Sequence, residues 1–111
     1  MATVRGIPGS PGIRMAKVRV VRDASDFGAV QEGEILVTRF ASPEVVLVFD
    51  RAAGLITDQG GRLAHAVVVA RELGVPAVVG TQDATARIRT GSVVTLDGDR
   101  GTVRLPIERQ T

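Results

Sequence analysis

The stretch GGRLAHAVVVARELGVPAVVG, Gly60 to Gly80, contains the only histidine of this 111-residue chain, His65. Apolar residues recur from Leu63 at intervals of three and four, which predicts a helix over Leu63–Leu73. A glycine and then a proline follow, in the order that commonly ends a helix. Three consecutive valines, Val67 to Val69, oppose this prediction because β-branched side chains disfavour helices. The periodicity and the terminating residues agree, so we expect a helix.

Short apolar runs on both sides of this helix predict strands at Gly54–Asp58 and Pro76–Gly80, with a tight turn at Gln59–Gly61. Ser42 and Pro43 are typical of a helix start. Further elements are expected as strands at Ile13–Val21 and Glu34–Thr38, a helix at Pro43–Ala53, a helical turn at Asp83–Gly91 and a hairpin at Ser92–Leu105. Gly6–Gly12 and Arg22–Gly33 are expected to be loops. This order predicts one α/β domain that spans residues 1–111.

The composition excludes several classes of protein. The chain has no cysteine, which excludes disulfides, thiolate metal sites and thiol nucleophiles. The net charge is only +2, the basic residues are scattered, and three Phe are the only aromatic residues besides histidine, so a nucleic-acid-binding module is not expected. No apolar run is long enough for a membrane span or a signal peptide, and a cytoplasmic location is expected.

The surroundings of His65 indicate a phosphate site. Gly60 and Gly61 let the backbone approach a ligand closely. The first turn of a helix has unpaired N–H groups and a dipole that favours an anion. The same end disfavours an imidazolium, and a neutral imidazole is a nucleophile. Together these features predict a histidine that can hold a phosphoryl group.

Other roles for His65 have less support in the sequence. A single histidine in an apolar segment is often only structural. A metal site is not expected, because His65 with Asp58 or Glu72 supplies too few ligands. A Ser-His-Asp hydrolase is disfavoured because no serine lies in a nucleophile-elbow motif.

The Gly60–Gly80 stretch closely resembles the phosphohistidine signature of the phosphoenolpyruvate-utilising enzymes: Gly-Gly, two residues, Ser or Thr, His, a small residue, then an apolar helix ending in Ala-Arg-Glu and Gly-Ile-Pro-Ala-Val. Three further segments are similar to parts of that family's mobile domain: GIPGSPGI, GEILVTRFASPEV and GSVVTLDGDRGTV. The resemblance therefore covers about Gly6 to Leu105.

The resemblance implies a layered β/β/α swivelling domain that carries a phosphoryl group between two active sites. One site is usually a nucleotide-binding domain of ATP-grasp type, and the other binds phosphoenolpyruvate, pyruvate or another acceptor. Mg²⁺ and ATP or phosphoenolpyruvate are expected on those partner domains, and no cofactor is expected on this chain. A chain of 111 residues cannot also contain those domains, so it is not expected to be a complete phosphotransferase alone.

Carried over residue by residue, the resemblance makes His65 the phosphocarrier and Gly60 and Gly61 the turn that approaches the phosphate. Arg62 is a candidate phosphate contact or a plain surface arginine. Ala64 departs from the family pattern, which often has Ser or Thr there. Its missing hydroxyl motivates an alternative function, a non-catalytic interaction or regulatory domain that keeps the fold.

Three neighbouring residues are candidates for supporting roles. Asp58 either orients the turn or the ring, or caps backbone amides. Arg71 lies about 240° round the helix from His65, which favours a structural ion pair or a partner contact over a phosphate contact. Glu72 shares the face of His65 but lies ~10 Å along the axis, so we do not expect it to be the catalytic base.

Overall fold

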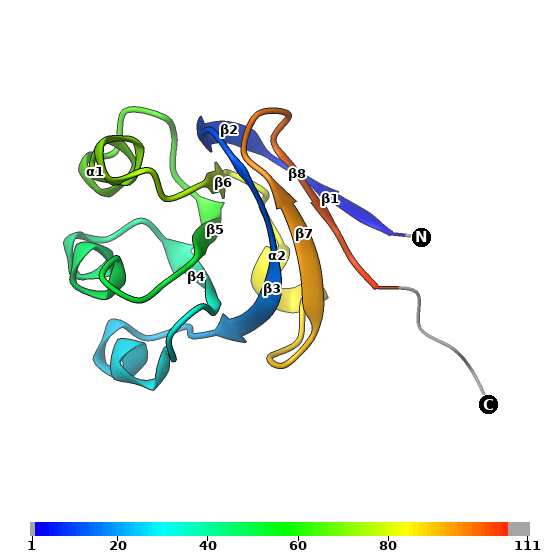
Figure 1. The fold of residues 1–111 in the computed structure, drawn as a ribbon, viewed down its shortest axis with the longest axis horizontal. Coiled ribbons are helices and arrows are strands. Elements are labelled where there is room, and N and C mark those ends of the chain that lie inside the picture. Colours follow the sequence, from blue (N-terminus) through cyan, green and yellow to red (C-terminus); the bar gives the residue numbers. More distant parts are fainter. Residues whose placement is uncertain (1, 107–111) are drawn as a thin grey trace.

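The strands of the chain join into one eight-stranded mixed sheet in the computed structural model, which describes residues 2–106 (Figure 1). In chain order the strands are β1 (Thr3–Arg5), β2 (Ile7–Ser10), β3 (Ile13–Val20), β4 (Ile35–Phe40), β5 (Gly54–Gln59), β6 (Ala77–Val79), β7 (Val93–Asp97) and β8 (Thr102–Arg104). Their order across the sheet is β1-β8-β7-β3-β4-β5-β6-β2. Strands β3 to β6 pair in parallel, and the other pairings are antiparallel.

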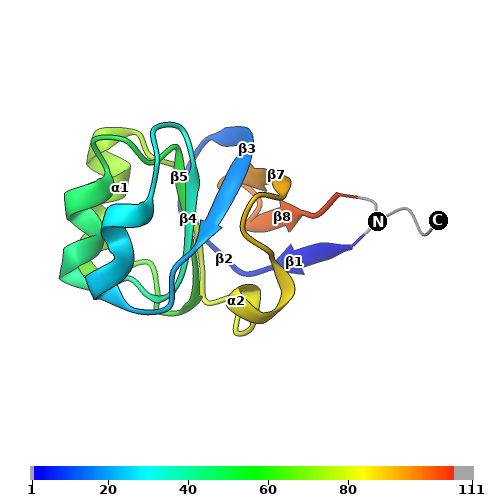
Figure 2. The same ribbon diagram turned by 90° about the horizontal axis from the view of Figure 1, so that it is seen from below.

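Helical segments cover one side of the parallel strands. They are the 3-10 helices η1 (Ala24–Ala29) and η2 (Pro43–Val48) and the α-helix α1 (His65–Leu73). On the other side of β4 and β5, strands β7, β8 and β1 fold back as a second layer, and α2 (Ala84–Arg87) lies at the end of the gap between the two layers (Figures 1 and 2). The result is the β/β/α layering that the resemblance implies, and this prediction of the fold class is confirmed.

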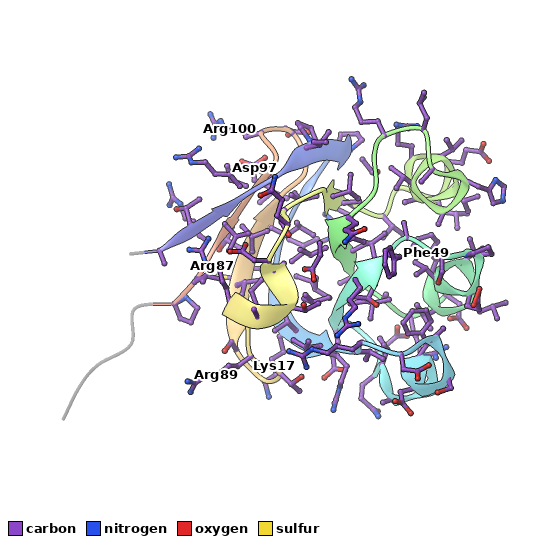
Figure 3. The ribbon with its side chains drawn as sticks, turned by 180° about the vertical axis from the view of Figure 1, so that it is seen from behind. Lys17, Phe49, Arg87, Arg89, Asp97 and Arg100 are labelled. Carbon is purple, nitrogen blue, oxygen red and sulfur yellow. The ribbon has the colours of Figure 1, made fainter. Side chains whose placement is uncertain are left out.

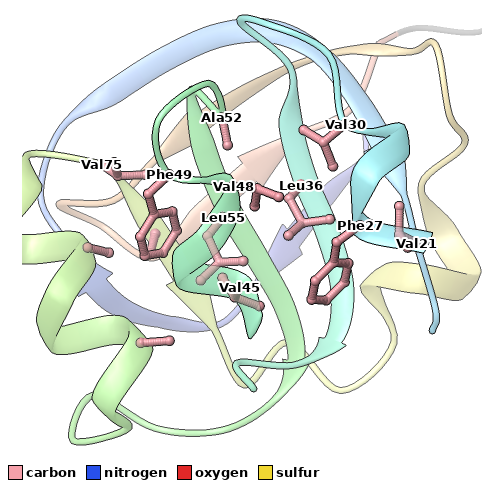
Figure 4. Packing of buried hydrophobic residues seen from close by; sticks show 13 residues of the cluster. Val21, Phe27, Val30, Leu36, Val45, Val48, Phe49, Ala52, Leu55 and Val75 are labelled. Atoms are coloured by element: carbon pink, nitrogen blue, oxygen red, sulfur yellow. The ribbon is translucent and has the colours of Figure 1, made fainter. Parts of the chain in front are cut away.

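Alternate side chains of the parallel strands are buried in two separate cores, one on each face of the sheet. This explains why the sequences of these strands are almost continuously apolar. Leu36 and Leu55 point to the helices, where they pack with Phe27, Phe49 and neighbouring valines (Figure 4). The next residues along each strand point the other way. That second core lies between the two sheet layers and contains Ile35, Val37, Ile56, Val94, Leu96 and Val103.

The predicted strands around α1 and the C-terminal hairpin are confirmed, but α1 begins at His65 rather than Leu63. The buried stripe of the helix consists of Ala66, Val67 and Ala70, whereas Leu63 precedes the helix and is 89% exposed. The helix is therefore two residues shorter at its start than the apolar spacing predicts.

Three predictions of local structure are wrong. The expected Gly6–Gly12 loop contains strand β2, which lies at the edge of the sheet, where proline is tolerated. The expected Pro43–Ala53 helix is a 3-10 helix that ends at Val48. Three of its six residues are valines, whereas α1 combines its three valines with Ala, Arg, Glu and Leu residues that favour an α-helix. The expected Arg22–Gly33 loop contains η1.

Candidate functional site

The imidazole of His65 is exposed on the first residue of α1, directly after the turn that leaves β5. The amides of Val67 and Val68 donate to the Ala64 carbonyl, at 2.9 and 3.0 Å. The amides of His65 and Ala66 find no acceptor in the described part of the chain, and the side chain of Ala64 cannot cap them. Two N–H groups without an acceptor among the described residues, and the positive end of the helix dipole, therefore lie at the start of the helix that carries the ring.

The Gly-Gly turn in front of the helix is open to solvent. Gly60 has a φ of +116°, a conformation that favours glycine. A Cβ atom added to Gly61 would have no neighbour within 4 Å, and one added to Gly60 would meet only the Thr57 hydroxyl at 3.9 Å. A small anion can therefore approach this backbone without displacing any other described part of the protein.

Arg71 fixes this turn to the edge of the sheet. Its Nη2 donates to the Arg62 carbonyl at 2.7 Å, and its Nη1 donates to the Gly9 carbonyl of β2 at 3.1 Å. The guanidinium thus bonds backbone carbonyls, and of the two expected roles, an ion pair or a partner contact, the ion pair is not formed among residues 2–106. Arg62 itself is exposed, and with Arg71 it lines two shallow depressions of about 240 and 590 Å³.

Asp58 is directed to the other helix. Its Oδ1 accepts from the Thr85 amide at 2.8 Å and its Oδ2 from the Thr85 hydroxyl at 2.6 Å. Of its expected uses the structure shows capping, of α2 rather than of the Gly-Gly turn. Glu72 is exposed near the far end of α1. The structure therefore keeps Gly60, Gly61 and Arg62 in the turn that leads to the histidine, places Arg71 as a support for that turn and directs Asp58 to α2.

Sequence reasoning missed Gly9 as a supporting residue. Its carbonyl accepts the Arg71 bond, and a Cβ added there would lie 3.0 Å from Cγ1 of Val67. The only local signal was its place in a Pro/Gly-rich segment, which indicates a turn and gives no hint of contact with a helix sixty residues later.

Within residues 2–106, no three His, Asp or Glu side chains gather in a way that could hold a metal ion. The described helices are all too short or too polar to cross a membrane. What the site offers chemically is an exposed imidazole beside backbone donors for an anion.

The layered sheet and the exposed histidine after a Gly-Gly turn define a mobile phosphohistidine domain. Residues 30–101 match the family described as PEP-utilising enzyme, mobile domain, and the chain belongs to this family.

Its relatives are much longer proteins. The chain is 51% identical over 100 residues to a probable phosphoenolpyruvate synthase of Pyrococcus abyssi and 50% identical to the phosphoenolpyruvate synthase of Pyrococcus furiosus. It is 43% identical to the uncharacterized phosphotransferase YvkC of Bacillus subtilis. These matches cover 88–90% of this chain but only 12% of each relative. The synthases therefore contain much more than this domain.

Two solved structures share the fold. The solution structure of Enzyme I (nEIt) superposes with a TM-score of 0.62 at 31% identity, over 78% of this chain and 34% of that one. Aconitase X of Thermococcus kodakaraensis superposes with a TM-score of 0.75 over 96% of this chain and 100% of that one, but at 19% identity, which shows similarity of fold alone.

Proposed function

We propose that this chain is a phosphocarrier in which His65 accepts a phosphoryl group and passes it on. The observation that carries the proposal is the exposed imidazole beside the free amides of His65 and Ala66 and the open backbone of Gly61. The donor and acceptor sites lie on partner domains or proteins in the cytoplasm. One partner is a nucleotide-binding domain of ATP-grasp type, and the other binds phosphoenolpyruvate, pyruvate or another acceptor. Mg²⁺ and ATP or phosphoenolpyruvate bind to those partners.

In the transfer step the unprotonated ring nitrogen of His65 attacks the phosphorus of the donor. The N–P bond forms as the P–O bond to the leaving group breaks, and that bonding pair leaves on the donor oxygen. The proton on the other ring nitrogen stays or passes to water. The charge on the phosphoryl oxygens is met by the amides at the start of α1 and by Arg62. Because phosphoryl transfer depends mainly on positioning and electrostatics, this small set of groups is sufficient at the carrier.

The test is phosphorus NMR of the protein incubated with phosphoramidate, which can phosphorylate an accessible imidazole without a partner domain. We expect an acid-labile phosphoimidazole signal from the native protein and none from His65→Ala. The exposed position of His65 makes this substitution harmless to folding, which circular dichroism checks. A signal of equal size from His65→Ala, or no signal from the folded native protein, would refute the proposal.

Ala64 supports a second candidate, a regulatory or interaction domain that keeps the fold without the chemistry. As the N-cap of α1 it makes no side-chain hydrogen bond, so no hydroxyl is available there to a phosphate. This candidate requires that His65→Ala retains partner binding and that no phosphoryl donor labels the native protein. The NMR experiment therefore decides between the two candidates.

A further inference from the structure

The outer side of the sheet layer formed by β1, β8 and β7 is not covered by any other element of residues 2–106. Strands β1, β8 and β7 turn Val4, Val94, Leu96 and Val103 toward the second core, where each is at most 1% exposed. Their alternate side chains point outward, and no helix lies over them (Figures 1 and 2). We call the outward side of β1, β8, β7 and the first half of β3 the open face.

The open face is basic. Arg5, Arg100 and Arg104 line a depression of about 340 Å³ together with three threonines and Asp97. The strand register places Arg104 opposite Thr3 and Arg5 two residues further along β1, so these two arginines are diagonal neighbours. Neither has a carboxylate within 4.0 Å among residues 2–106. Two neighbouring guanidinium groups without a counter-charge favour a bound anion.

The acidic residue in this depression, Asp97, is hydrogen-bonded within the β7–β8 turn. One oxygen of Asp97 accepts from the amides of Asp99 and Arg100, both at 3.0 Å, and the other lies 3.5 Å from Nη1 of Arg100. Figure 3 shows Asp97 and Arg100 together at the end of the β7–β8 hairpin, with Lys17 at the far end of β3. Asp97 therefore pairs with Arg100, and leaves Arg5 and Arg104 without an ion pair among residues 2–106.

Apolar side chains lie next to the basic depression. Ile13, Met15 and Val93 are 53%, 74% and 45% exposed. The register places Ile13 opposite Asp97, Met15 opposite Thr95 and Val93 opposite Lys17, so all three share the open face. Arginine and methionine are enriched at protein contacts, and a flexible methionine adapts to different partners. Three large apolar residues together differ from the scattered exposed residues of an ordinary surface.

We propose that the open face is a docking surface for an acidic protein surface with an apolar centre. Carboxylates of that partner pair with Arg5 and Arg104, while its apolar residues cover Met15 and Ile13. The charge of the face selects an acidic occupant, and its apolar strip lacks the aromatic platforms that stack nucleic-acid bases. The open face lies on the side of the molecule away from helix α1, which carries His65 at its first residue (Figure 1). Docking therefore leaves His65 free.

The experiment is an NMR titration of backbone amides with a synthetic peptide that has glutamates on one side of a helix and leucines on the other. We expect shifts in β1, β7 and β8, and affinity that falls with added salt. Arg5→Gln/Arg104→Gln should weaken binding about tenfold, and Met15→Ser about threefold. The control Ala29→Glu/Gln31→Glu changes the net charge equally on exposed positions of the helical layer and should alter the affinity by less than about twofold.

Several outcomes would overturn the proposal. The first is that the peptide shifts the amides of the helical layer instead, and the second is that the control pair weakens binding as much as the arginine pair does. The third is tighter binding of an oligothymidylate or of inorganic phosphate at the same face. The fourth is that the amides of the face shift with protein concentration and without peptide, which would make a second copy of this chain the occupant. The titration is repeated with His65→Ala, which should bind as the native protein does. The docking surface and the phosphocarrier role can therefore fail independently.

Discussion

The two helices that follow strands β5 and β6 begin in opposite ways. At α2 the first amides are satisfied by side chains from elsewhere in the chain. The Ala84 amide donates to the Thr81 hydroxyl at 3.2 Å, and the Thr85 amide donates to the Asp58 carboxylate at 2.8 Å. At α1 the amides of His65 and Ala66 find no such partner in the described residues, and the N-cap residue is an alanine.

This difference shows that the fold supplies side-chain acceptors to one helix start and leaves the other open. Asp58, which the sequence places close to the Gly-Gly turn, is used instead to close α2. Satisfied amides stabilise a helix, whereas free amides remain available to an anion. The open start of α1 is thus a local property of the His65 turn, consistent with the proposed phosphate site.

Removal of the α2 cap should have the largest effect. Asp58→Ala leaves the buried amide and hydroxyl of Thr85 without their acceptor, and we expect a loss of roughly 2–4 kcal/mol in the free energy of unfolding. Urea titration measures it. Thr85→Val removes only the hydroxyl bond and should cost less. Phosphoramidate labelling of His65 per folded molecule should not change, and a loss of labelling without a loss of stability would show that Asp58 acts on the histidine.

Adding a cap to α1 should have a smaller effect of the opposite sign. Ala64→Ser places a hydroxyl at the N-cap, which we expect to raise the free energy of unfolding by about 1 kcal/mol. The same hydroxyl can bond a phosphoryl oxygen, so labelling should be up to roughly tenfold faster. The matched control, Ala86→Ser at an exposed position of α2, should change neither quantity by a comparable amount. Slower labelling of Ala64→Ser would mean that the free amides matter more than the hydroxyl.

The smallest expected effect is on the loss of folding stability at low pH. Acid also hydrolyses phosphohistidine, so loss of the label and unfolding of the protein have to be measured separately. The Arg19 guanidinium, bonded to Glu34 at 3.0 Å through both Nε and Nη2, holds the pKa of that carboxyl below its ordinary 4.5. The unfolded chain therefore binds this proton more readily. The stabilisation is complete above about pH 4.5 and is lost as the pH falls through the lower folded value.

Glu34→Gln should therefore flatten the decline in stability on acidification below pH 4.5, measured by thermal unfolding at a series of pH values. Glu32→Gln, which removes an exposed carboxylate that makes no ion pair among residues 2–106, serves as the control and should retain the native slope. An unchanged slope in Glu34→Gln would place the acid sensitivity elsewhere in the chain.

The sequence predicts those features that depend on nearby residues. Strands β5 and β6, helix α1 and the β7–β8 hairpin each have a local pattern of apolar and turn residues. The candidate site lies within six consecutive residues, from Gly60 to His65. Its glycines, its helix start and its nucleophile can therefore all be recognised from one short segment of the sequence.

Features that depend on distant residues could not be predicted. Strand β2 has only four residues and pairs with β6, some seventy positions later. The Arg71–Gly9 bond joins residues 62 apart, and the Asp58–Thr85 bonds join residues 27 apart. The residues around Arg71 do not show that it bonds carbonyls instead of a carboxylate, and those around Asp58 do not show that it bonds Thr85 instead of the histidine ring. Only the sheet topology brings these partners together.

The two ends of the described chain are joined. The Leu105 amide donates to the Ala2 carbonyl at 3.0 Å, and Thr3 pairs with Arg104. These joined ends lie on the opposite side of the molecule from α1, whose first residue is His65 (Figure 1). Where such a domain is linked to others through both ends, the two links meet at one place, and the domain can rotate about it as a rigid body. A modest rotation at the ends then sweeps the imidazole through a wide arc while the turn that holds it keeps its shape.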